Sequence, residues 1–283
     1  MSVKVGVPLF LLRPERIVDV ARRAEELGFE SVWMPEHLVF PVRIASRYPY
    51  TQDGVPPIRV DMPLLDPLIV LAQIAAVTRR IRLGTNVYVL PLRHPLSTAR
   101  LAVSVDVLSG GRLTLGIGAG WLEEEFQAVG VDFARRGAIT RECVRALKAL
   151  WTEPEPRFQG KTFAFGPLRF EPKPVQKPHL PIVFGGESDA ALKRAAALGD
   201  GWYGVGHTAE SAAAQVRRLR LLLLDAGRDG QPFEITVSAG AHALDRTALE
   251  RFAEAGVDRV VVLPWTRGRD AEEQLARLAE AAL

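Results

Sequence analysis

The sequence is poor in cysteine, in long apolar runs and in excess charge of either sign. Cys143 is the only cysteine among 283 residues, which excludes an internal disulfide and gives no reason to leave a reducing compartment. No apolar run reaches the length of about 18 residues that a membrane helix needs. The N-terminal segment also lacks the pattern of a secretory signal. We therefore expect a cytoplasmic protein without a membrane span.

The small net charge and the scattered positions of potential metal ligands exclude further classes of function. The formal net charge is only +3, and the arginines are spread along the chain, so a nucleic-acid surface is not indicated. No HxxxH or CxxC spacing indicates a metal, and no Gly-x-Ser-x-Gly motif indicates a hydrolase. We expect a small-molecule organic substrate and no metal. The five histidines are His37, His94, His179, His207 and His242.

What the chain does contain is an alternation of short apolar runs with amphipathic segments. With 48% hydrophobic residues it can bury a large core. Eight strand and helix pairs favour an α/β fold, a (β/α)8 TIM-type barrel, over an open sheet. The predicted strands are Val3–Pro8, Ser31–Met34, Arg82–Leu90, Leu113–Gly118, Pro181–Phe184, Gly201–Gly204, Glu234–Ala239 and Arg259–Leu263. The predicted helices are Pro14–Leu27, Pro67–Thr78, Pro95–Leu108, Arg135–Trp151, Ser188–Leu198, Ala209–Ala226, Leu249–Ala255 and Ala271–Ala279.

We predict a single domain over residues 1–283 with two insertion segments. The first, about residues 40–65, follows strand two and is rich in Pro, Tyr and Arg, as expected of a lid over the active face. The second, about residues 153–180, follows helix four and lies on the opposite face. Its stretch Arg157–Phe163 predicts a hairpin closed by Gly160, which we interpret as structural.

Active sites of such barrels lie at the C-terminal ends of the strands. Strand two ends in Glu36 and His37, a carboxylate beside an imidazole that can position a ligand and move a proton near neutral pH. His37 could also merely pack under the following loop, but its place at a strand end favours a functional role. For His94, entry into helix three by packing is the better interpretation.

Glycines gather at the ends of two further strands. Gly116, Gly118 and Gly120 permit close approach of a ligand to the backbone, but their spacing departs from a dinucleotide fingerprint. The acidic trio Glu123–Glu125 that follows is most simply a solvated first helical turn.

Gly185 and Gly186 lead through Glu187 into Ser188, a helix N-cap. Free N–H groups at such a start form a ready site for an anion, although plain capping needs only Ser188. Strand six, through Gly204, either lies along the same ligand or makes an ordinary turn.

Taken together, these motifs resemble the luciferase-like monooxygenase superfamily, and more closely its F420-dependent oxidoreductases. The resemblance runs from strand one to at least strand six. It is carried by Ser31–His37, Arg82–Thr85, Gly116–Trp121, Gly185–Ser188 and Gly199–Trp202 in this order and spacing.

The resemblance implies a deazaflavin or flavin ring across the barrel mouth, with its phosphate at Gly185–Ser188. It also implies a non-proline cis peptide between Asn86 and Val87. His37 becomes the candidate proton donor or acceptor. The implied cofactor-binding residues are Glu36, Asn86, Val87, Gly118, Ala119, Gly120, Gly185, Gly186, Glu187, Ser188 and Gly204.

Two departures from the family pattern bear on the substrate. Glu36 stands where the family has Asp, which leaves its cofactor contact open. Trp121 stands where sugar-phosphate-oxidising relatives place an acid, so a sugar phosphate is not expected. Trp121 with the lid residues Tyr48 and Tyr50 indicates an apolar or aromatic substrate, although packing accounts for the tryptophans nearly as well.

Three functions follow as hypotheses. The first is F420-dependent hydride transfer between the deazaflavin C5 and an organic substrate, with His37 handling a proton. The second is an FMN-dependent monooxygenase fed by a separate reductase, because the same barrel holds both cofactors. The third is a non-catalytic flavin- or deazaflavin-binding protein. From the resemblance we also expect a homodimer.

Overall fold

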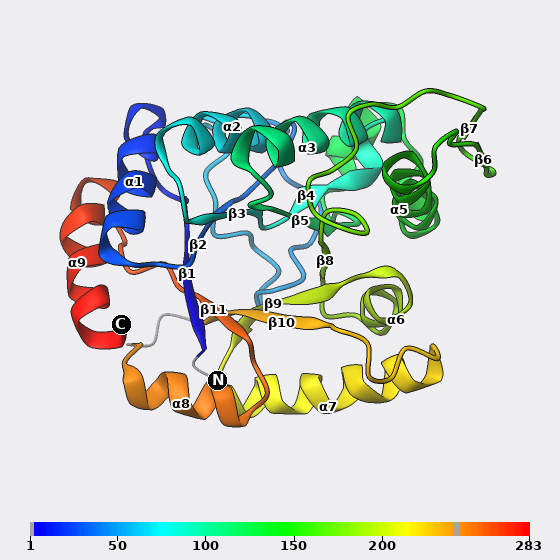
Figure 1. The fold of residues 1–283 in the computed structure, drawn as a ribbon. Coiled ribbons are helices and arrows are strands. Elements are labelled where there is room, and N and C mark those ends of the chain that lie inside the picture. Colours follow the sequence, from blue (N-terminus) through cyan, green and yellow to red (C-terminus); the bar gives the residue numbers. More distant parts are fainter. Residues whose placement is uncertain (1–2, 240–243) are drawn as a thin grey trace.

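A computed structural model describes residues 3–239 and 244–283, and its parallel strands close into a ring (Figure 1). Strand β1 (Lys4–Pro8) pairs with both β2 (Ser31–Met34) and β11 (Arg259–Val261), which joins the two ends of the sheet. This closure confirms the predicted (β/α)8 barrel. The ring continues from β2 through β3 (Arg82–Thr85), β5 (Leu113–Gly118), β8 (Ile182–Gly185), β9 (Gly201–His207) and β10 (Glu234–Ala239).

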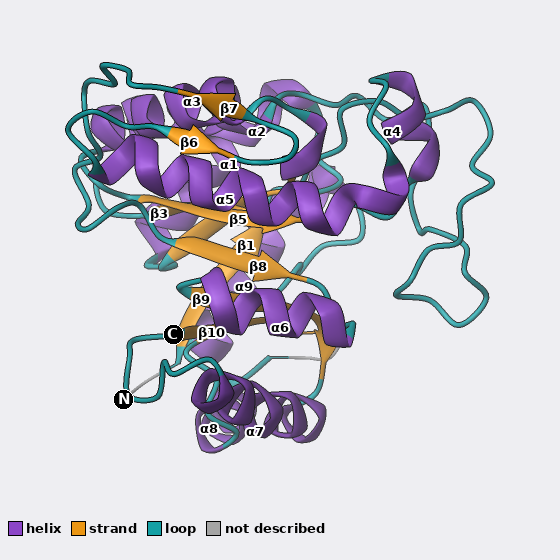
Figure 2. Ribbon diagram, turned by 90° about the vertical axis from the view of Figure 1, so that its right-hand side faces the viewer, coloured by secondary structure: helices purple, strands orange, loops and turns teal. Residues whose placement is uncertain are grey.

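Helices surround this ring and bury their apolar faces against it (Figures 1 and 2). Their ends follow local chemistry: Pro67 opens α2 behind the cap Asp66, and Gly28 ends α1 at a φ of 93°. Among the helices of the described residues, none combines the length and apolar character needed to cross a bilayer. The helices are α1 (Ile17–Leu27), α2 (Pro67–Val77), α3 (Pro95–Ser109), α4 (Glu123–Ala128), α5 (Arg136–Thr152), α6 (Asp189–Leu198), α7 (Ala209–Asp225), α8 (Arg246–Glu254) and α9 (Ala271–Ala282).

The third predicted strand, Arg82–Leu90, is wrong as one continuous element. It divides into β3, which pairs with β2 and β5, and β4 (Tyr88–Val89), which pairs with β5 alone. Between them lies the cis peptide Asn86–Val87, as the family resemblance implied. The eighth strand ends at Val261, two residues earlier than predicted, whereas the sixth runs on to His207.

One large side chain fills the middle of the barrel. Trp33 is 1% exposed and donates from Nε1 to Ser31 Oγ over 2.9 Å. A β-carbon at Gly84 would lie 2.3 Å from the Trp33 ring, and one at Gly6 would lie 2.9 Å from its Nε1. Strands β3 and β1 therefore need glycine at these positions, because the Trp33 side chain occupies the space inside the barrel.

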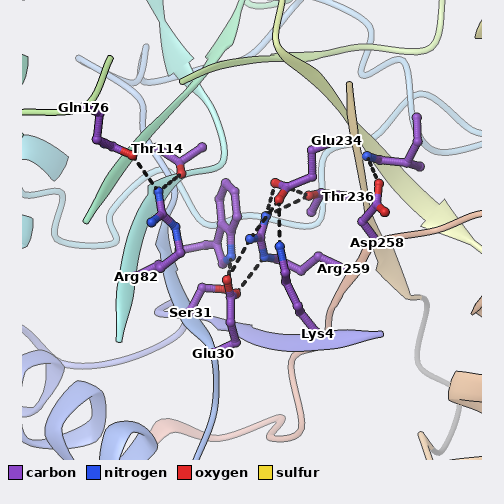
Figure 3. Close-up of polar contacts among 12 residues, drawn as sticks. Lys4, Glu30, Ser31, Arg82, Thr114, Gln176, Glu234, Thr236, Asp258 and Arg259 are labelled. Atoms are coloured by element: carbon purple, nitrogen blue, oxygen red, sulfur yellow. Dashed lines mark hydrogen bonds and ion pairs between the residues drawn. The ribbon is translucent and has the colours of Figure 1, made fainter. Parts of the chain in front are cut away.

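The N-terminal end of the barrel is closed by an ionic network around Arg259 (Figure 3). The guanidinium is 1% exposed, bonds Glu30 at 2.7 and 2.8 Å, and also pairs with Glu234. Lys4 reaches Glu234 from β1 over 3.2 Å. Two carboxylates facing two cations make this buried cluster balanced in charge, and it leaves the opposite end of the barrel for a ligand.

Both insertion segments have the predicted character. Residues 40–65 contain no helix or strand, and their Ala45 and Ser46 amides donate to Glu124 of α4 over 2.6 and 3.0 Å. Residues 153–180 carry the antiparallel pair β6 (Phe158–Gln159) and β7 (Ala164–Phe165), turned at Gly160. Gln176 ties the last part of this second segment to Leu113 O at the start of β5, away from the lid. Its hairpin reaches the helix starts on the mouth side, where Phe163 contacts His94 at 5.1 Å and Thr162 accepts from Arg135, so the predicted placement on the opposite face holds only for the last part.

Candidate active site

His37 follows β2 at the C-terminal mouth and is held by a buried carboxylate. Its Nδ1 lies 3.2 Å from Oε2 of Glu125, whose side chain has no exposed surface. Glu125 Oε1 accepts from the amides of Leu38 and Val39. Because this carboxylate only accepts, it selects the tautomer of His37 that carries a proton on Nδ1. Nε2 of His37 is then free to accept a proton from a ligand.

The solvated-turn interpretation of the acidic trio is therefore wrong for two of its three members. Glu125 is fully buried, and Glu124 accepts from the lid at Ala45, Ser46 N and Ser46 Oγ. These hydrogen bonds hold the pKa of Glu124 at about 2, although its slight burial acts in the opposite sense. Only Glu123 is exposed as predicted.

Aromatic side chains enclose His37 on the lid side. Its ring lies 4.7 Å from Phe40 and 5.6 Å from Trp121 between centroids. Tyr48 contacts Trp121 at 5.0 Å and Tyr50 at 5.3 Å. The aromatic wall, defined as Phe40, Tyr48, Tyr50 and Trp121, thus joins the three predicted substrate residues to His37.

Glu36 follows β2 one residue before His37 and enters a buried ion pair. Its Oε2 accepts from Val89 N over 2.5 Å, and its Oε1 lies 2.5 Å from Nη2 of Arg93. Burial raises the pKa of Glu36, and Arg93 together with the Val89 amide offsets part of that rise. The Arg93 guanidinium stacks over Tyr88 at 4.4 Å. Glu36 thereby holds β4 in place behind the cis peptide.

Asn86 and Val87 form the floor of the mouth. Asn86 Nδ2 donates to Tyr203 Oη over 3.2 Å, and its Oδ1 is enclosed with no partner within the described residues. Val87 fits against Gly118 and Gly185, where added β-carbons would lie 2.6 and 2.9 Å from its methyl groups. The packing of Val87 thus requires glycine at both positions.

The segment Gly185–Ser188 links β8 to α6 as predicted. Ser188 caps α6 by accepting from Ala191 N over 3.3 Å, and Gly186 has a φ of 116°. Glu187 reaches the end of β9, where it accepts from Val205 N over 2.9 Å and lies 3.3 Å from His207 Nε2. Ala191 N–H is used by this cap, so the N–H groups of Asp189 and Ala190 are those left for an anion.

The other residues considered in the sequence analysis are less directly placed for contact with a cofactor. A β-carbon at Gly204 would meet Trp202 at 2.2 Å and His207 at 2.8 Å, so packing outside the barrel explains this glycine. Trp202 is fully buried there and donates to Gly186 O. Ala119 and Gly120 are partly exposed at the end of β5. His94 caps α3 by accepting from Leu96 N, which confirms its packing role.

Sequence reasoning missed three polar residues of this site. Glu125 is one of three consecutive acids, and the sequence does not distinguish it from the other two. Arg93 lies in a segment whose sequence indicates an ordinary turn. Tyr203, 3% exposed with its hydroxyl bonded to Asn86, lies inside a glycine-rich strand. Only alternation along β9, which places Tyr203 inside the barrel opposite Trp202, could have indicated it.

The fold and the site define a class: a (β/α)8 barrel with a proton-carrying histidine and a helix N-terminus at its C-terminal mouth. A model of the luciferase-like monooxygenase family matches residues 5–282. The chain belongs to this family, whose members are oxidoreductases.

Two relatives show how far the similarity extends. An uncharacterised protein of Mycobacterium tuberculosis is 37% identical over 262 residues, which are 92% of this chain and 91% of that protein. An FMNH2-dependent dimethylsulfone monooxygenase of Pseudomonas putida is 32% identical over 154 residues, which are 53% of this chain and 42% of that enzyme. The second match spans less than half of the enzyme.

Two solved structures share the whole architecture. A monooxygenase from Streptomyces bottropensis superposes with a TM-score of 0.77 at 22% identity, covering 99% of this chain and 98% of that one. An F420-dependent secondary alcohol dehydrogenase, solved with an F420-acetone adduct, gives 0.78 at 17% identity and covers 98% of both chains. At these identities the likeness shows the fold.

Proposed function

We propose that this protein is an F420-dependent oxidoreductase that transfers a hydride between deazaflavin C5 and an organic substrate. The observation that carries the proposal is the His37–Glu125 pair. A histidine at a strand end, fixed through Nδ1 by a fully buried carboxylate, is the arrangement of a general acid or base. The lid closes over it through Glu124, which limits the access of water.

The mouth fits such a cofactor at two points. Asn86 Oδ1 is a buried acceptor without a partner among the described residues, suited to an N–H on the edge of a ring. The free N–H groups at the start of α6 suit its phosphate. Asn86, the Val87 floor and Gly185–Ser188 would hold the group. When bound, a deazaflavin supplies or takes up a hydride and does not readily activate oxygen, which favours reduction or dehydrogenation.

The residues of the chain supply the proton chemistry and the surroundings. In the assigned tautomer His37 Nε2 accepts a proton from a substrate hydroxyl during oxidation, and returns it in the reverse direction. Glu125 stabilises the imidazolium formed in that step, because its carboxylate lies 3.2 Å from Nδ1.

The aromatic wall defines the class of substrate. Phe40 and Trp121 place ring surface against His37, and Tyr48 and Tyr50 extend that surface beyond Trp121. Among the described residues, no Lys or Arg side chain stacks on the rings of the wall. We infer an uncharged alcohol or carbonyl compound with an apolar or aromatic body.

The test is a turnover assay with F420 and its reduced form across alcohols, ketones and enones. We expect turnover by the wild type and loss of it in His37→Asn, with cofactor binding retained. Wild-type binding of F420 without turnover on any member of the panel would instead favour a non-catalytic binding protein.

A second candidate is an FMN-dependent monooxygenase, favoured by the Pseudomonas putida relative. None of the contacts at the mouth excludes an FMN ring. Oxygen uptake with reduced FMN and a substrate, absent with F420, would support this second function.

A further inference from the structure

Helices α5 and α6 lie side by side (Figure 2) and carry a marked excess of positive charge. Their sequences contain six cations against two carboxylates, whereas the whole chain is nearly balanced at +3. The carboxylates are Glu142 and Asp189. The cations are Arg136, Arg141, Arg145, Lys148, Lys193 and Arg194.

Neither carboxylate neutralises the arginines between the helices. Asp189 pairs with Arg218 of α7. Glu142 turns to the hairpin of the second insertion and accepts from Thr162 N over 2.8 Å. Within the described part of the chain, Arg136, Arg141 and Arg194 have no carboxylate within 4.0 Å.

Arg194 of α6 is half-buried and packs against α5. Its Nη1 lies 3.0 Å from the point where a β-carbon on Gly137 would stand, so it rests on the first turn of α5. Its Nε is buried and has no acceptor among the described residues. Burial, followed by the charges of Arg141 and Arg136, lowers the pKa of Arg194. Like charges without a counter-charge are costly, so the arrangement calls for an anion.

The cluster lies at the rim of the mouth. Arg136 donates from Nε to Gly120 O over 3.2 Å, at the end of β5. Helix α6 begins directly after Gly185–Ser188, at the end of β8. A ligand whose phosphate sits at the α6 N-terminus can therefore extend a charged chain along these arginines.

We propose that Arg136, Arg141 and Arg194, the rim cluster, bind an oxyanion, a phosphate or carboxylate on a chain that leaves the mouth between α5 and α6. The assignment of that chain to the cofactor rests on the proposed function. Binding at the rim cluster explains how the protein selects F420 over FMN, because F420 carries carboxylates beyond its phosphate, whereas FMN ends at one phosphate. Guanidinium groups suit both kinds of oxyanion.

The experiment titrates wild type, Arg194→Gln, Arg141→Gln and Arg194→Lys with three deazaflavins, at low and at high salt. These are F420, F420 shortened to its phospholactate, and the riboside that lacks phosphate and carboxylates. The matched control is Arg145→Gln, because Arg145 is exposed on α5 and outside the rim cluster. Tryptophan fluorescence follows binding.

We expect both Gln variants to bind F420 about tenfold or more weakly, a loss of one charge-assisted contact. Riboside binding should be unchanged in all variants, Arg194→Lys should recover part of the affinity, and Arg145→Gln should match wild type. A loss confined to full-length F420 assigns the site to the carboxylates of the removed tail, and a loss shared with the phospholactate form assigns it to the phosphate or the lactate carboxylate. Equal losses for F420 and the riboside, or none, would overturn the proposal.

A second arm separates this site from the proposed function. Thermal unfolding with inorganic pyrophosphate needs no deazaflavin, and pyrophosphate should raise the Tm of wild type more than that of Arg194→Gln. If no deazaflavin binds but this difference appears, the rim cluster stands and the F420 function fails. Equal shifts in both proteins would remove the rim cluster itself.

Discussion

At the scale of single residues, burial decides which of three consecutive acids contributes to the candidate site. Glu123, Glu124 and Glu125 are chemically identical, yet one is exposed, one holds the lid and one holds His37. The pattern of three acids is typical of a solvated helix start, and no spacing rule distinguishes the third. His37 could be predicted, because it ends a barrel strand. Its partner could not, because their contact spans 88 residues.

Replacing Glu125 by Gln should alter proton transfer more than binding. The amide still accepts from Leu38 N but no longer stabilises the imidazolium, so we expect kcat to fall while the affinity for the cofactor is retained. Steady-state kinetics and a cofactor titration measure the two effects, with Glu123→Gln as the control. An unchanged kcat for Glu125→Gln would contradict the role of this pair.

Replacing His37 by Asn removes the proton-carrying group itself. We expect a loss of about 10²–10⁴-fold in kcat, measured by the same kinetics.

Replacing Arg93 by Met should leave the buried Glu36 without its counter-charge. We expect a loss of about 3–5 kcal/mol in the free energy of unfolding, and a smaller loss in the double variant with Glu36→Gln. Urea denaturation measures both proteins. If the double variant is no more stable than Arg93→Met, the ion pair is not the cause of the loss.

At the scale of elements, the strand and helix order follows from hydrophobic alternation, whereas the break in the third strand does not. Tyr88, Val89 and Leu90 continue the apolar run, so the pattern extends the strand through them. The structure interrupts it because Val87 must fit between Gly118 and Gly185. That break was indicated by the family resemblance alone.

The lid is attached to the barrel chiefly through Glu124, and its exposed Arg43, Arg47 and Arg59 are sites for trypsin. Glu124→Ala should therefore speed tryptic cleavage within residues 40–65. Glu123→Ala is the matched control, because its side chain is exposed on the same turn. Cleavage rates by gel or mass spectrometry give the answer, and equal rates in the two variants would show that Glu124 does not hold the lid.

At the scale of the whole molecule, a buried ionic network closes one end of the barrel and the ligand chemistry lies at the open end. The pKa values of Glu30 and Glu234 lie below the usual 4.5: burial raises them, and Arg259 lowers them by more. A depressed pKa contributes stability above about pH 4.5 that is lost as the pH falls through the folded value.

Acid should therefore destabilise the barrel from this end. We expect the Tm of wild type to drop between about pH 5 and pH 3. Glu234→Gln should have a lower Tm at pH 7 and a shallower drop on acidification. Differential scanning fluorimetry across this range tests the expectation, and parallel curves for the two proteins would exclude the Arg259 network as a source of the pH dependence.

A parallel titration of the apo protein with F420 and with FMN tests the proposed cofactor, with binding followed by tryptophan fluorescence, to which Trp121 at the mouth contributes. We expect micromolar binding of F420 and much weaker binding of FMN. The reverse order would make the protein a flavin monooxygenase, and the absence of binding by either would contradict the site itself.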